Sequence, residues 1–142
     1  MENCVFCQII RGEIPGTFVH QDDRAVIFLD INQAAQGHLL IAPRNHREQW
    51  HELDDATAAH LGKLAADFAP AVVNAFDADG YNLLQNNGEA AGQEVMHVHL
   101  HLIPRWQNDH YFGRGPRQRK AEAEELQDTA ERIETEKRKL ES

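Results

Sequence analysis

Apolar residues are arranged along this chain in short runs separated by turn-forming residues, with one longer stretch at helical spacing. Short apolar runs bounded by Gly, Pro, Asp or Asn predict β-strands. The predicted strands span residues 17–20, 25–29, 39–42, 81–85 and 95–103. The polar residues 21–24 predict a hairpin turn between the first two strands, and residues 8–16 predict a turn-rich lead-in.

Residues 55–76 have the spacing of an amphipathic helix. Asp54 or Asp55 can cap its start, and Pro70 is expected to kink or divide it. Strands combined with one long helix predict an α+β fold. The apolar residues of the helix follow one another at steps of three or four: Leu61, Ala65, Phe68, Val72 and Phe76.

The C-terminal stretch, residues 117–142, differs from the rest because it has no Gly, Pro or aromatic residue. It predicts a helix with a thin apolar seam at Leu126, Ala130, Ile133 and Leu140, too thin to be central to a core. We therefore divide the chain into a domain at 1–112 and a linker with a helical extension at 113–142. The extension either packs loosely on its own domain or binds a partner, and we expect it to be dispensable for chemistry.

Charge and composition limit the possible partners. The chain has 142 residues, 42% of them hydrophobic, and a net charge of −9. Such an acidic chain is not expected to bind nucleic acid or anionic membranes through charge alone, although local cations or amides can still hold a phosphate. No apolar run is long enough for a membrane span, and MENCVFCQII lacks the features of a signal peptide. We expect a cytoplasmic protein.

Two features suggest chemistry. Cys4 and Cys7 form a C-x-x-C pair, which suits either buried or redox thiols, or half of a zinc site. Residues 97–105 read HVHLHLIPR, so a strand would place His97, His99 and His101 on one face and aliphatic residues on the other. One isolated histidine is usually a core residue, whereas three on one face indicate a functional site.

The histidine strand resembles the H-x-H-x-H-x-x motif of the histidine-triad (HIT) nucleotide-binding proteins. Four segments are similar, in order, to the bacterial Hit and Hint branch: GEIP at 12–15, DDRAVIFLDI at 22–31, GHLLIAPRNH at 37–46 and NNGEAAGQEVMHVHLHLIPR at 86–105. The resemblance implies an antiparallel sheet with one long helix, paired into a homodimer. It also implies a purine nucleotide or nucleotidyl conjugate as ligand, and cleavage at its α-phosphorus. Nucleoside phosphoramidates and dinucleoside polyphosphates are typical substrates.

The resemblance also implies roles for individual residues. His99 would be the nucleophile and His101 a donor to the phosphate or leaving group, where transferase branches carry Gln. Asp30 would accept from the ribose hydroxyls, although a strand-end cap is the alternative. His38 would support the site from behind. The full nucleotide-binding set implied is Phe6, Asp30, Ile31, Asn86, Gly92, Gln93, Glu94, Val95, His99 and His101. Glu94 replaces a Ser of many Hint-type members and makes a phosphoramidate preference an open question.

Family members with this N-terminal C-x-x-C often hold zinc. The matching ligands here would be Cys4, Cys7, His46 and His97. Two thiolates and two imidazoles fill a tetrahedral site, so the metal would be structural.

Two other functions compete with hydrolysis. A nucleotide-binding protein with little turnover would use the same pocket, and rates on several adenylyl conjugates would separate the two. A non-haem iron oxygenase would need a carboxylate beside H-x-H and would leave the C-x-x-C pair unexplained.

Overall fold

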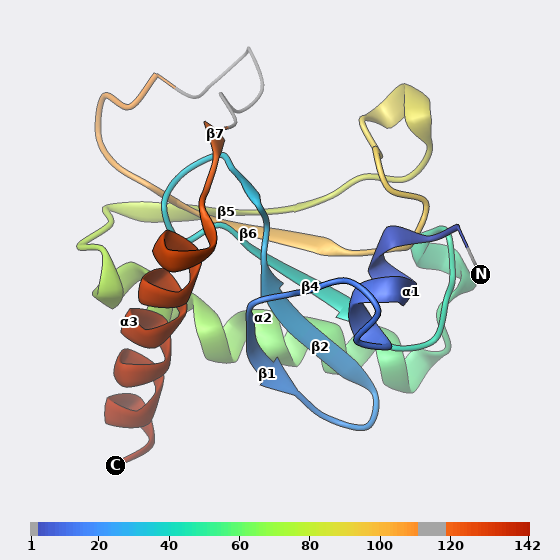
Figure 1. Cartoon of the computed structure of the whole chain (residues 1–142), viewed down its shortest axis with the longest axis horizontal. Helices are drawn as coiled ribbons and strands as arrows, with labels where there is room; N and C mark the ends of the chain where they lie inside the picture. Colours follow the sequence, from blue (N-terminus) through green and yellow to red (C-terminus); the bar gives the residue numbers. More distant parts are fainter. Residues whose placement is uncertain (1–2, 111–118) are drawn as a thin grey trace.

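The computed structural model describes residues 3–110 and 119–142 and centres on a five-stranded antiparallel sheet (Figure 1). The strand order is β1-β2-β4-β6-β5, so β1 and β5 form the edges. This arrangement confirms the predicted α+β fold. The strands are β1 (Phe18–Gln21), β2 (Ala25–Leu29), β4 (Leu39–Pro43), β5 (Gly80–Gln85) and β6 (Leu100–Arg105).

The interior strands β2 and β4 are buried on both faces, which explains their uninterrupted apolar sequences. Ile27 and Ile41 belong to the main core beneath the long helix α2 (Asp55–Ala75). Val26 and Phe28 pack on the opposite face with Phe6, from the short helix α1 (Val5–Ile10). The sheet therefore separates two apolar layers, and the smaller one borders the functional cavity described below.

Helix α2 begins after Asp54, whose carboxylate accepts from the Thr57 N–H at 3.1 Å. The expected division at Pro70 is wrong, because α2 continues through this residue to Ala75. Pro70 lies on the exposed side of the helix. Ala66, whose carbonyl cannot accept a helical hydrogen bond from Pro70, is exposed as well, so water can reach this turn of the helix.

Two local expectations for the N-terminal segment and the histidine strand are corrected. The lead-in contains α1, capped by Cys4, whose Sγ accepts from the Cys7 N–H at 3.4 Å. The histidine strand is shifted, because β6 covers Leu100–Arg105 instead of 95–103. Before it, the chain leaves the sheet ladder, and the Val98 N–H donates to the Arg47 carbonyl at 2.8 Å.

The C-terminal helix α3 (Ala123–Glu141) packs against α2, and Figure 1 places it at the opposite end of the fold from α1. The helical prediction is confirmed, but the expectation of a marginal seam is wrong. Leu126, Ala130 and Ile133 belong to the main core, and Ile133 is fully buried. Close packing against another helix lets even a narrow seam contribute to the core. The linker residues 113–116 lie outside the described residues.

Short elements complete the described chain. Strand β7 (Arg119–Lys120) pairs with β3 (Asn32–Gln33), and the Ala121 N–H donates to the Ile31 carbonyl at 2.8 Å. This pairing brings the segment before α3 against the loop that follows β2. Two 3₁₀ turns occur, η1 (Trp50–Glu52) and η2 (Glu89–Ala91). Across the described ranges, the helices are all too short or too polar to cross a membrane.

Candidate functional site

A cavity of about 310 Å³ opens beside α1 and the ends of β2 and β6. One part of its wall is apolar, with Phe6, Ile9, Phe28 and Leu40 among the lining residues. Asp30, His38, His99 and His101 supply polar groups. A mostly apolar hollow with a few convergent polar groups is typical of a small-ligand site.

The orientation of His99 follows from one hydrogen bond. Its Nδ1 lies 2.6 Å from the carbonyl oxygen of His97. A carbonyl only accepts, so Nδ1 carries the proton, and Nε2 of the neutral ring keeps its lone pair. Burial lowers the pKa of His99, although its bond to the His97 carbonyl and the charge of Glu94 oppose this shift. The ring is therefore neutral near pH 7, with an unprotonated nitrogen available for attack.

His101 is the opposite tautomer to His99, with its proton on Nε2, because of its hydrogen bond with His38. The Ala34 N–H donates to Nδ1 of His38 at 3.1 Å, so the His38 proton resides on Nε2. That nitrogen lies 2.9 Å from Nδ1 of His101 and donates to it. Nε2 of neutral His101 must then carry its own proton. Burial, with the neighbouring His99, lowers the pKa of His101 to about 4, so a neutral donor is present at pH 7.

Asp30 follows β2 and is held by its own loop. Its Oδ1 accepts from the Asn32 N–H at 2.9 Å, and its backbone carbonyl accepts from the amide of Gln33. Gln33 is buried and also accepts from the Gly37 N–H at 2.9 Å. Burial raises the pKa of Asp30 to about 6, and the charge of Glu94 adds to the shift. The carboxyl is therefore mainly ionised at pH 7 and can accept hydrogen bonds from a ligand.

The loop between β5 and β6 forms another edge of the cavity. Gly88 and Gly92 have φ angles of 88° and 95°, a region that favours glycine. Gln93 braces the loop from inside: its Oε1 accepts from the Gly88 N–H at 2.7 Å, and its Nε2 donates to the Glu48 carbonyl at 2.7 Å. Its side chain is thus occupied within the protein, while the neighbouring Glu94 is exposed and lines the cavity.

A separate cluster joins Cys4, Cys7, His46 and His97, whose ligand atoms all lie within 4.8 Å of one another. Cys7 Sγ is 3.4 Å from Nδ1 of His46, and Cys4 Sγ is 3.4 Å from Nδ1 of His97. A zinc ion with Zn–S bonds of about 2.3 Å and Zn–N bonds of about 2.0–2.1 Å has tetrahedral S···N edges of about 3.5 Å. These separations fit that ion.

The hydrogen bond at the far side of His97 also fits a metal ligand. Nε2 of His97 donates to the Pro43 carbonyl at 2.8 Å, which leaves Nδ1 unprotonated and directed at the two sulfurs. Such a bond from the second nitrogen to a carbonyl commonly orients a zinc-bound histidine. The donor set is therefore compatible with zinc.

Comparison with known proteins identifies the family. A family model described as the HIT domain matches residues 11–108 of the chain. The chain belongs to the HIT family.

Relatives and solved structures of the family align over most of the chain. Protein hit of Bacillus subtilis (strain 168) is 43% identical over 112 residues, which cover 79% of this chain and 77% of that protein. Adenosine 5'-monophosphoramidase hnt1 of Schizosaccharomyces pombe is 37% identical over 113 residues, covering 80% and 82%. The crystal structure of a Zn-bound histidine triad family protein from Mycobacterium smegmatis superposes with a TM-score of 0.86 at 28% identity, covering 99% and 96%.

The HIT fold brings together nearly all the residues implied by the sequence. Of the ten residues implied to bind the nucleotide, only Gln93 does not line the cavity. The other nine are Phe6, Asp30, Ile31, Asn86, Gly92, Glu94, Val95, His99 and His101. Sequence reasoning missed the bracing role of Gln33 and the proton direction set by Ala34. A buried glutamine five residues before a histidine gives no local signal, because its partners depend on how the loop closes.

Proposed function

We propose that this HIT-family protein is a nucleotidyl hydrolase that cleaves at the α-phosphorus of nucleotidyl conjugates. The observation that carries the proposal is the tautomer of His99, which leaves Nε2 unprotonated in a residue lining the cavity. The donor on His101 stands beside it, with ring centroids 4.8 Å apart. One nucleophile and one donor on adjacent rings suit displacement at phosphorus.

The reaction then has two steps. Nε2 of His99 attacks the α-phosphorus, and the bond from phosphorus to the leaving group breaks. Nε2–H of neutral His101 donates a hydrogen bond to a phosphoryl oxygen, where negative charge accumulates, and the departing amine takes its proton from a water molecule. The hydroxide so formed attacks the nucleotidyl-histidine, and the N–P bond breaks to release the nucleoside monophosphate and neutral His99. Dividing the displacement in this way lowers the barrier of each step.

The rest of the cavity would bind the nucleotide. The ionised carboxylate of Asp30 suits the two ribose hydroxyls as donors, and Phe6 and Ile31 offer apolar surface for a purine base. Asn86 and the backbone from Gly92 to Val95 would contact the sugar-phosphate. Relatives such as the S. pombe adenosine 5'-monophosphoramidase support an adenylyl phosphoramidate as a substrate. Exposed Glu94 would repel anionic leaving groups, which favours a neutral or cationic amine.

We also propose that Cys4, Cys7, His46 and His97 hold a structural zinc ion. The fit of the ligand separations and the Zn-bound relative support this role. When bound, zinc would join α1 to the segment before β6, and four protein ligands would leave it no open position. Thiolate ligands agree with the reducing conditions of a cytoplasmic location.

A homodimer completes the proposed assembly. β5 is an edge strand, and Tyr81 and Leu83 on it are exposed at 49% and 46%. An apolar edge strand of this kind would be covered by the same strand of a second copy, beside α2. Sedimentation of wild type and Leu83→Glu would test this pairing, since an unchanged dimer in the variant would contradict it.

The experiment that tests the hydrolase is a trap of the covalent intermediate. Adenosine 5'-phosphoramidate is mixed with the protein, quenched early and examined by intact mass. We expect a mass increase of one adenylyl group on wild type and none on His99→Ala, together with release of AMP by wild type alone. AMP binding without turnover by the wild type would instead support the competing function, a nucleotide-binding protein.

A further inference from the structure

Three side chains that do not line the nucleotide cavity converge on one point. His20 lies on β1, Asp22 in the turn after β1, and His60 on α2. The Oδ2 atom of Asp22 is 2.7 Å from Nε2 of His20 and 2.7 Å from Nε2 of His60. All three ligand atoms lie within 4.8 Å of one another. The three side chains are 24–29% exposed, so water and ions can reach them.

The turn fixes the direction of the carboxylate. Oδ1 of Asp22 accepts from the Arg24 and Ala25 N–H groups, both at 2.8 Å. Oδ2 is therefore left to face the two imidazoles. Burial alone would raise the pKa of Asp22, but the hydrogen bonds from the two histidines and the two N–H groups lower it below its usual range. The carboxyl group is therefore ionised at neutral pH.

We propose that His20, Asp22 and His60 form a second metal site, which binds a divalent transition-metal ion such as Zn²⁺. Two imidazole nitrogens and one carboxylate oxygen are ligands that zinc accepts at about 2.0–2.2 Å. Tetrahedral bonds of that length place neighbouring ligand atoms about 3.4 Å apart. The two imidazoles, now 2.7 Å from Oδ2, would therefore move outward by about 0.7 Å and release their Nε2 protons when the ion binds. Water would complete the coordination.

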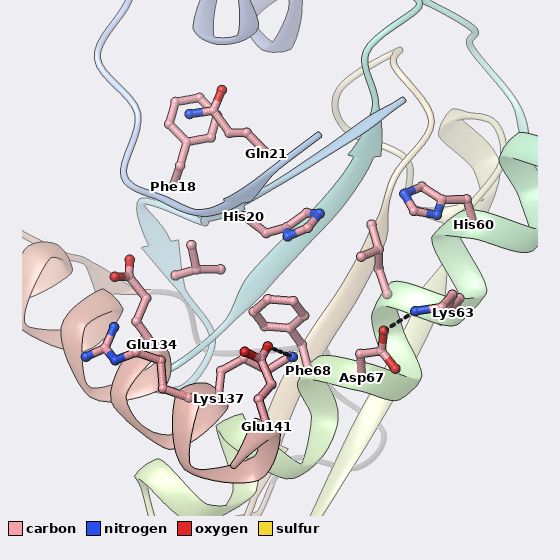
Figure 2. A pocket seen from close by; sticks show the side chains of 13 residues that line it. Phe18, His20, Gln21, His60, Lys63, Asp67, Phe68, Glu134, Lys137 and Glu141 are labelled. Atoms are coloured by element: carbon pink, nitrogen blue, oxygen red, sulfur yellow. Dashed lines mark hydrogen bonds and ion pairs between the residues drawn. The ribbon is translucent and has the colours of Figure 1, made fainter. Parts of the chain in front are cut away.

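The setting of the site gives this ion a structural consequence. β1 is an edge strand, and the ion would fasten the β1–β2 turn to the long helix α2. Figure 2 shows His20 and His60 entering the same groove from these two elements. The groove has a volume of about 550 Å³ and would give ions a route from solvent. No thiol belongs to this set, which separates it chemically from the cluster at Cys4.

Zinc stoichiometry on the full chain tests the proposal. The protein is first loaded with one equivalent of Zn²⁺, and a second equivalent is then followed by calorimetry and native mass spectrometry. We expect saturable binding of the second ion. Asp22→Asn, which keeps an oxygen for the two N–H groups, and His60→Gln should each weaken it by at least about tenfold. His51→Gln is the matched control, an exposed histidine outside the site, and should keep both ions.

The melting temperature separates loss of metal binding from misfolding of a variant. Binding to the folded state alone raises the melting temperature, so excess Zn²⁺ should stabilise wild type and His51→Gln more than Asp22→Asn. Excess Mg²⁺, which prefers oxygen ligands, should not displace the ion. If Asp22→Asn and His60→Gln bind as many zinc ions as wild type, with unchanged affinity, the site does not exist.

The proposals for this site and for the cysteine cluster can be refuted separately. In Cys4→Ser the ion at His20, Asp22 and His60 should persist, so a single retained equivalent that is then lost on adding His60→Gln still supports the site. Loss of every bound ion from Cys4→Ser alone would overturn it.

Discussion

Replacing Asp30 with Asn should stabilise the nucleotide-free protein, and the gain should depend on pH. The Asp30 side chain is 15% exposed, and burial with the charge of Glu94 raises its pKa from 3.8 to about 6. Ionising it therefore costs more in the folded chain than in the unfolded chain. The free energy of unfolding is therefore highest, as far as Asp30 is concerned, below about pH 4, where the carboxyl is protonated in both states. It falls as the pH rises through about 6, where the folded chain must ionise the group. The loss above that range approaches about 3 kcal/mol, at 1.36 kcal/mol for each tenfold change.

Urea unfolding of wild type and Asp30→Asn measures this cost. Asn keeps the acceptor for the Asn32 N–H, so the comparison isolates the charge. The advantage of the variant should be about 2 kcal/mol larger near pH 7.5 than near pH 4.5. Glu94→Gln is a matched second variant: it removes one cause of the raised pKa, so the pH dependence should shrink. A pH-independent difference between wild type and Asp30→Asn would refute the reasoning. The same variant should bind AMP more weakly, because an amide replaces the acceptor proposed for the ribose.

Three further predictions concern other parts of the chain. In urea unfolding, Ile133→Ala should lower the free energy of unfolding by about 2–5 kcal/mol. Leu140→Ala, at a residue of the same helix that is 48% exposed, should change it by less than about 0.5 kcal/mol. Equal effects of the two substitutions would contradict the packing of α3. His99→Ala should abolish turnover of adenosine 5'-phosphoramidate while calorimetry still detects AMP, and retained kcat would remove the nucleophile assignment. His46→Ala should lose one equivalent of zinc on metal analysis and melt at a lower temperature; a zinc content equal to that of wild type would show that His46 is not a ligand.

The parts of the fold that sequence predicted are those governed by hydrophobic pattern alone. β2 and β4 are buried on both faces, so their apolar runs were sufficient. The spacing in 55–76 gave α2 to within one residue at its end. The helix α1 could not be predicted in this way, because its six residues are held by the Cys4 cap and by Phe6 entering the smaller core. The later start of β6, at Leu100 instead of residue 95, likewise could not be predicted, because the Val98 N–H bonds to the carbonyl of Arg47, a residue distant in sequence.

The hydrophobic pattern was an even poorer guide to the packing of the C-terminal extension, residues 117–142. Its apolar residues are few, and pattern alone favoured a loosely attached helix. The structure buries Ile133 fully and places Arg132 over the Phe76 ring, at 4.5 Å from its centroid. Because β7 also pairs with β3 next to Ile31, removing 117–142 would expose the core and release a wall of the cavity. We therefore expect the truncated chain to lose stability as well as activity, in place of the dispensable tail that the sequence suggested.

The alternation H-x-H-x-H predicted the location of the site but not how its three rings differ. Each ring has one nitrogen fixed by a different acceptor or donor: His97 by the Pro43 carbonyl, His99 by the His97 carbonyl, and His101 by His38. The remaining nitrogens differ as a result. Nδ1 of His97 has a lone pair directed at the sulfurs, Nε2 of His99 has a lone pair that faces the cavity, and Nε2 of His101 carries a proton. His97 links two of these functions, because its side chain belongs to the proposed zinc site and its carbonyl sets the tautomer of His99. An ion at the cysteine cluster would thus hold the peptide group whose carbonyl orients His99, and this would connect the proposed structural metal to the proposed nucleophile without any contact between the metal and the substrate.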